Sequence, residues 1–183
     1  MTFATVRYCL LYALLLACNG SKSTDGKSVP QLELIASYEM DMAEPSGLSV
    51  GAGGLVLWAV GNNPERIYKL TVEGKTLETL TYKGDDLEGI VFDAVDSTLW
   101  IVEEERREVI QLDLGGTVLR RHELDLTGKR NSGLEGISFG GQHHLWVLNE
   151  KNPGMLVMLA DDLSINSRQE LDFASDYSAL AYD

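Results

Sequence analysis

The sequence predicts an all-β protein, a β-propeller of four-stranded antiparallel blades, with three complete blades and a fraction of a fourth. Three recurring markers along the 183 residues lead to this class. The first is a tripeptide that precedes a short apolar segment. The second is a Leu-Trp pair, and the third is a short aliphatic segment at the centre of a later strand. Four short strands every 42–47 residues are typical of a propeller blade. The tripeptide copies are Ser46-Gly47-Leu48, Glu88-Gly89-Ile90, Glu135-Gly136-Ile137 and the looser Ser178-Ala179-Leu180.

The spacing of the markers is what makes the repeat convincing. The central residues of the tripeptides are 42, 47 and 43 residues apart, and the Leu-Trp pairs at Trp58, Trp100 and Trp146 are 42 and 46 apart. No segment shows a 3.6-residue periodicity of helical length, which argues against a helical solenoid. A β-sandwich would not repeat its markers at this period.

Each repeat divides into four expected strands. The second strand carries the Leu-Trp pair and is almost continuously apolar, which indicates burial on both faces. The fourth alternates in polarity, as an outer strand should. We also expect an extra strand over residues 32–40, before the first complete repeat. The expected first strands are 47–50, 89–92 and 136–139; the second and fourth strands of the first repeat are 55–60 and 77–82; the third strands are 66–71, 108–114 and 155–160.

The tryptophans have a structural and a functional interpretation. A large apolar side chain at the same place in each repeat would fill the wedge between neighbouring blades, and this is the interpretation we favour. A stacking surface for a sugar or a base is the alternative.

The N-terminus is expected to be a targeting segment. Arg7 precedes an apolar run, Tyr8 to Ala17, that is too short for an ordinary transmembrane helix. The run ends in Leu-Leu-Ala followed by Cys18, which resembles the lipobox of bacterial lipoproteins. We therefore expect a signal peptide over 1–17, lipidation of Cys18, a flexible tether over 18–30 and propeller repeats over 31–183. An ordinary signal peptide that happens to contain a Cys is the alternative.

Composition excludes some functions. The net charge is −13 and no Lys/Arg cluster is visible, so the sequence does not predict nucleic-acid binding. The acidic balance suits solubility or the attraction of cations. The mature part would contain no Cys beyond Cys18, so no disulfide is expected.

Aligning the repeats places acidic residues just before each first strand, the innermost strand of a propeller blade. Carboxylates that face one narrow channel mouth repel each other, and a hard cation such as Ca²⁺ would relieve the repulsion. Ordinary solvated loop acids are the alternative. This first column gives the candidate metal ligands Glu44, Asp86, Glu88, Glu135 and Asp176, together with Ser46, Gly133 and Ser178 at aligned positions.

A second column of oxygen-bearing side chains follows the second strand, at Asn62, Glu104 and Glu150. Its neighbours Glu103 and Glu105 suit a charged loop with local ion pairs. His143 and His144 lie in a turn at the opposite end and make no zinc-like spacing. The sequence contains no phosphate loop.

The ordered set of tripeptide, Leu-Trp strand and following acidic or amide residue resembles the SdiA-regulated family of bacterial envelope proteins. The resemblance covers roughly residues 31–183 and implies a six-bladed propeller, often lipid-anchored, with no established biochemical activity. The sequence departs from this pattern in length, since it ends at Asp183 within the expected fourth blade.

These observations lead to an envelope protein, anchored to a membrane outside the cytoplasm through the lipid on Cys18. Its propeller would bind a small ligand, a cation such as Ca²⁺ or an envelope protein partner at the channel mouth. The alternative is a Ca²⁺-dependent hydrolase of the lactonase or phosphoesterase type, with Glu88, Glu135 or Glu104 as the base near the metal. Scaffolding without ligand binding also stays open.

Overall fold

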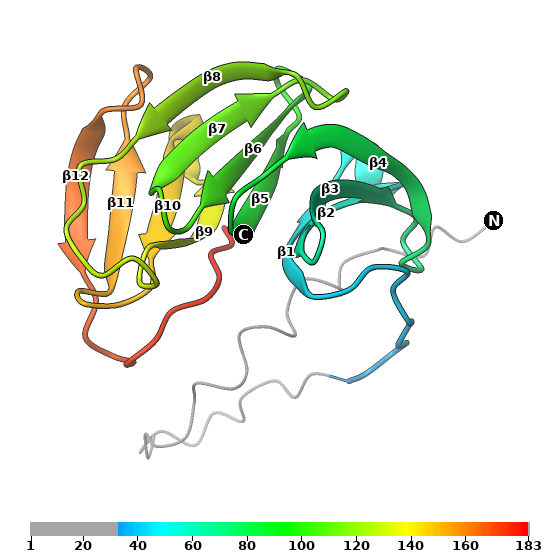
Figure 1. Ribbon diagram of the computed structural model, residues 1–183, viewed down its shortest axis with the longest axis horizontal. Helices are drawn as coiled ribbons and strands as arrows, with labels where there is room; N and C mark the ends of the chain where they lie inside the picture. The colour runs from blue at the N-terminus through cyan, green and yellow to red at the C-terminus, as the bar shows by residue number, and fades with distance from the viewer. Residues whose placement is uncertain (1–32, 183) are drawn as a thin grey trace.

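The computed structural model describes residues 33–182 and confirms the all-β propeller blades (Figure 1). Three four-stranded antiparallel sheets follow one another along the chain, and each sheet pairs its strands in sequence order. The first blade contains β1 (Pro45–Val50), β2 (Leu57–Asn62), β3 (Glu65–Leu70) and β4 (Thr76–Lys83); the second contains β5 (Leu87–Asp93), β6 (Thr98–Glu103), β7 (Glu108–Leu112) and β8 (Val118–Glu123); the third contains β9 (Leu134–Phe139), β10 (Leu145–Asn149), β11 (Met155–Leu159) and β12 (Ile165–Glu170). Short 3₁₀ turns, η1 (Ala52–Gly54) and η2 (Gly141–His143), join the first and second strands of blades one and three.

Burial of the second strands on both faces explains how the blades pack. All six residues of β6 are buried. Leu99 and Ile101 belong to the apolar core shared with the first blade, whereas Trp100 and Val102 belong to the core shared with the third. Successive side chains of a strand point to opposite faces, so a middle blade needs a continuous apolar run in this strand.

Trp58 and Trp100 fill the space between blades, which is the interpretation favoured from the sequence, whereas Trp146 of the third blade is half-buried. Trp58 is 2% exposed and packs in the core between blades one and two, and Trp100 is 5% exposed in the core between blades two and three. The ring of Trp100 meets Phe139 of the third blade edge-on at 6.3 Å between centroids. These rings are therefore not available as a stacking surface.

The glycines of the repeated tripeptide let the inner strands approach each other. A Cβ at Gly47 would lie 2.6 Å from the Glu88 carbonyl oxygen of β5. One at Gly136 would lie 2.8 Å from the Leu180 nitrogen, in the looser fourth copy. Real Cβ atoms are not found this close to backbone atoms, so any side chain here would push neighbouring blades apart.

The structure corrects two strand predictions. The predicted strand over 32–40 is wrong for residues 33–40, which form no strand. An apolar segment becomes a strand only when another strand offers it hydrogen bonds, and Leu34 and Ile35 stay 64% and 72% exposed. Residues 178–180 take the position of a fourth inner strand beside β9 but have no ladder partner among the described residues.

The predicted signal peptide, lipidated Cys18 and tether lie outside the described residues. Within residues 33–182, no helix has the length and apolar character needed to cross a membrane.

Candidate functional site

The inner strands each contain a β-bulge at the candidate-site residue of the repeated tripeptide. In the first blade Pro45 pairs with Gly61 and Gly47 with Val60, so Ser46 is an extra residue. The second and third blades repeat this irregularity at Glu88 and Glu135. A bulge re-aims a side chain and twists the strand locally. The fold thus places Ser46, Glu88 and Glu135 at equivalent points around one channel mouth.

Backbone hydrogen bonds join the two columns of candidate residues within each blade. The N–H of each second-column residue donates to the carbonyl two positions before the bulged residue. The three bonds are Asn62 to Glu44 at 3.2 Å, Glu104 to Asp86 at 2.9 Å and Glu150 to Gly133 at 2.8 Å. The columns that the sequence suggests as separate sets are therefore two sides of one mouth.

Contacts between blades then bring the second column of one blade against the first column of the next. Asn62 Nδ2 donates to Glu88 Oε1 at 2.8 Å, from blade one to blade two. Glu104 Oε1 accepts the Gly133 N–H at 3.1 Å, from blade two to blade three. The same relative placement recurs because the repeats have the same shape.

Five carboxylates converge at this mouth. In each of two groups of three acids, one carboxylate oxygen per residue lies within 4.8 Å of the other two. Glu104 belongs to both groups, so it is the centre of the cluster. The groups are Asp86, Glu88 and Glu104, and Glu104, Glu135 and Glu150. We call these five residues the carboxylate cluster.

Crowding and burial change the acidity of the cluster. Burial raises the pKa of Glu135 to about 8, and the charges of Glu88 and Glu104 add to the increase. Burial likewise raises the pKa of Glu104 to about 7, helped by the adjacent Asp86 carboxyl. The pKa of Glu88 also rises through burial, although the Asn62 amide opposes it. Ionising all five side chains is thus unfavourable without a counter-charge.

Two predicted ligands belong to neither group of three, and one cation lies beside the cluster. Glu44 is exposed and belongs to neither group of three. Asp176 accepts a hydrogen bond from Lys151 Nζ at 3.4 Å, and the same ammonium also donates to Glu150. Sequence reasoning missed Lys151, because only the three-dimensional arrangement shows that its ammonium donates to both Glu150 and Asp176.

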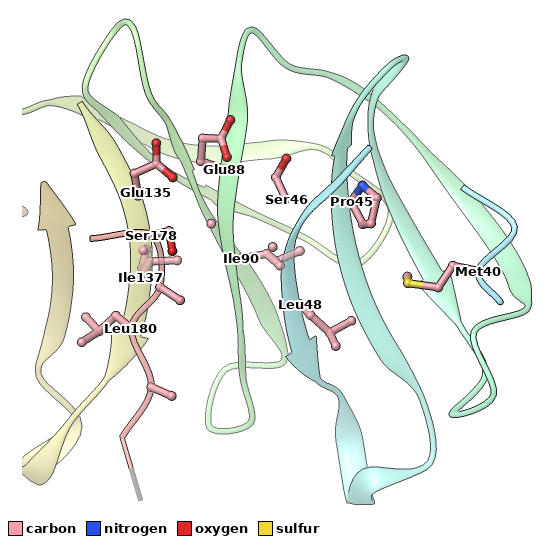
Figure 2. A pocket seen from close by; sticks show the side chains of 15 residues that line it. Met40, Pro45, Ser46, Leu48, Glu88, Ile90, Glu135, Ile137, Ser178 and Leu180 are labelled. Atoms are coloured by element: carbon pink, nitrogen blue, oxygen red, sulfur yellow. The ribbon is translucent and has the colours of Figure 1, made fainter. Parts of the chain in front are cut away.

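The inner strands and residues 178–181 line an open pocket of about 240 Å³ below the mouth (Figure 2). Glu88 and Glu135 point toward one end of it, together with Ser46. Aliphatic side chains line the rest of the wall. The lining side chains labelled in Figure 2 are Met40, Pro45, Ser46, Leu48, Glu88, Ile90, Glu135, Ile137, Ser178 and Leu180.

Comparisons with known proteins agree with the fold. The sequence model of the SdiA-regulated family matches residues 32–183. None of the curated proteins compared with the chain matches it significantly.

Solved propeller structures resemble the chain at low sequence identity. Virginiamycin B lyase from Staphylococcus aureus is 19% identical with a TM-score of 0.58, over 80% of this chain and 48% of that chain. A protein of unknown function from Bacteroides caccae is 15% identical with a TM-score of 0.55, over 69% of this chain and 46% of that chain. The chain spans less than half of the length of these structures, and the likeness concerns the fold alone.

Proposed function

Since the chain belongs to the SdiA-regulated family, we propose that it is a lipid-anchored envelope protein whose propeller binds a cation at the channel mouth. One observation carries the proposal. Glu104 is only 8% exposed, yet it lies within 4.8 Å of two pairs of acids drawn from two blades. Ionised carboxylates cannot donate hydrogen bonds to one another, and Lys151 contacts only Glu150 among the five acids, so the other four need protons or a further cation.

Ca²⁺ is the inorganic ion that fits this donor set. It takes six to eight oxygen ligands from carboxylates, carbonyls and water, in flexible geometry. The carboxylate cluster supplies only oxygen donors, and the described residues place no His or Cys in either group of three. Softer ions such as Zn²⁺ prefer nitrogen and sulfur ligands, so this mouth favours a hard cation.

The lipid anchor on Cys18 is the second part of the proposal. The apolar run that ends at Ala17 has the length of a signal-peptide core, and a small residue then Cys follows it. Lipidation would hold the propeller at a membrane surface outside the cytoplasm, with residues 18–30 as the tether. A ligand-binding mouth on such a tether would sample solutes or partner proteins of the envelope.

Thermal unfolding with and without Ca²⁺ tests the cation site. A ligand that binds only the folded state at a hundredfold excess over its Kd stabilises by about 2.7 kcal/mol. We expect millimolar Ca²⁺ to raise the melting temperature of the chain at about pH 8. The double variant Glu88→Gln/Glu135→Gln should lose this increase.

Glu44→Gln is the matched control, because Glu44 is an exposed acid of the same sequence column outside the cluster. It removes one negative charge but should keep the full Ca²⁺ response. A wild-type chain that does not respond to Ca²⁺, or a response that Glu44→Gln reduces as much as the double variant, would rule out the site.

A further inference from the structure

Beneath the carboxylates, the pocket wall changes from polar to aliphatic in one step. Each copy of the repeated tripeptide contributes one residue to each level, with Gly or Ala between them. Figure 2 shows the two levels along neighbouring inner strands. The polar tier is Ser46, Glu88, Glu135 and Ser178; the aliphatic tier is Leu48, Ile90, Ile137 and Leu180.

The Gly or Ala between the two tiers allows neighbouring inner strands to lie close together. A Cβ at Gly89 would lie 3.1 Å from the Glu135 carbonyl oxygen and 3.2 Å from Ile137 Cγ2. The inner strands therefore lie close together, and Ile90 and Ile137 line the pocket while packing into the cores on the two sides of blade two. Both side chains are 4% exposed.

A bare metal ion would use only half of this pocket. It would be bound by the carboxylates at the rim and leave the half-buried Leu48 and Leu180 of the aliphatic tier in contact with water. Apolar surface left in contact with water contributes nothing, whereas covering it is favourable by about 25 cal/mol per Å². Among residues 33–182, no Lys, Arg or His lines the pocket, so an anionic ligand would face two carboxylates without a counter-charge.

We propose that the channel mouth binds a primary organic ammonium ion that carries a short aliphatic group. The three N–H donors of the ammonium head bind to the carboxylates of Glu88 and Glu135 and to the Ser46 hydroxyl. The aliphatic group covers Leu48 and Leu180, the half-buried residues of the tier below. The inference rests on the proposed cation site, because the head group uses the same carboxylates.

The volume of the open pocket suits a small ligand. Its volume of about 240 Å³ is below the range of about 300–1,000 Å³ that is usual for drug-sized ligands. A small alkylamine matches this volume better than a peptide or a long lipid.

Calorimetric titration of the full chain with straight-chain amines tests the inference. The series runs from ammonium through methylamine and propylamine to pentylamine, with pentanol as the uncharged probe. Each methylene that becomes buried contributes about 0.8 kcal/mol, which is roughly a fourfold increase in affinity. We expect affinity to rise by about this factor per carbon until the tier is covered, and pentanol to bind far more weakly.

Variants of the aliphatic tier separate this inference from the cation site. Leu180→Asn changes a half-buried residue of the terminal segment, so it should leave the blades folded. We expect it to flatten the dependence on chain length while leaving ammonium and Ca²⁺ binding unchanged. Leu77→Asn, on the outer strand β4 where Leu77 is 56% exposed, should change neither.

The outcomes distinguish the two proposals. Affinities independent of chain length in the wild-type chain, with Ca²⁺ still bound, would overturn the inference and support the cation site. A chain that binds neither amines nor Ca²⁺ would overturn both. Equal binding of pentanol and pentylamine would show that the carboxylates do not recognise the head group, and would also overturn the inference.

Discussion

Replacing Glu104 by Gln should stabilise the protein at neutral and alkaline pH, although it changes a buried residue. The glutamine side chain has nearly the same shape as that of glutamate, and its oxygen can still accept the Gly133 N–H. What disappears is the central charge of the carboxylate cluster. Because removal of a buried partner normally destabilises, a gain in stability would be a specific sign of charge repulsion.

The pKa of Glu104 sets the magnitude. It lies at about 7 in the folded protein, against 4.5 for the unperturbed side chain. Each pKa unit corresponds to about 1.4 kcal/mol, so ionised Glu104 costs the folded state on the order of 3 kcal/mol at most. Because neighbouring acids share this repulsion, we expect Glu104→Gln to gain roughly 1–3 kcal/mol at about pH 8.

The sign of the pH dependence follows from the raised pKa. The folded state holds the proton more tightly, so its stability is highest where Glu104 is protonated and decreases as pH rises from about 4.5 through about 7. The advantage of Glu104→Gln should therefore be almost absent near pH 4.5 and complete near pH 8. The pKa of Glu135 is raised to about 8, so its ionisation also lowers the stability of the wild-type protein as pH rises.

Urea unfolding followed by tryptophan fluorescence, with EDTA present, measures the effect. In thermal unfolding, the same gain of 1–3 kcal/mol would appear as a rise in melting temperature of roughly 2–12 °C for a domain of this size. Equal destabilisation of the variant at both pH values would rule out charge repulsion as the main effect. It would mean that the charge of Glu104 is already balanced in the folded protein and that the site does not accommodate the glutamine NH₂ group.

Three further changes test the packing and the anchor. Gly89→Val should destabilise the protein by about 1–3 kcal/mol, because a Cβ at this position would lie 2.9 Å from Val102 Cγ2. Gly115→Ala, in an exposed turn, is the control. Equal effects of the two changes would contradict the role given to Gly89. Trp100→Ala should cost about 3–5 kcal/mol in urea unfolding, and a cost below about 1 kcal/mol would contradict its place between blades. Cys18→Ser should abolish labelling with radioactive palmitate and leave an uncleaved precursor, whereas efficient release of unlabelled wild-type protein would contradict the anchor.

The fold could be predicted because propeller packing forces the same burial pattern on every blade. A central strand that is buried on both faces must be apolar throughout, and the sequence of β6 shows this pattern. The strand expected before β1 failed for the opposite reason. Alternating apolar residues around Leu34 satisfy local propensity, but a strand also needs hydrogen-bond partners that local sequence does not specify.

The sequence was enough to predict which residues form the candidate site, but not which of them lie close together. Aligning the repeats found Glu88, Glu104 and Glu135, since each blade places them alike. It could not show that the two columns meet, because that depends on the bulges and on distances between blades. Nor could it show that Lys151 lies between Glu150 and Asp176.

Equilibrium dialysis of the mature chain against radioactive Ca²⁺ at about pH 8 is the decisive test of the cation site at the channel mouth. We expect saturable binding of one ion per chain, retained in Glu44→Gln and lost in Glu104→Gln. A chain that binds no Ca²⁺ at millimolar concentration, or binding that survives Glu104→Gln unchanged, would contradict the proposed site.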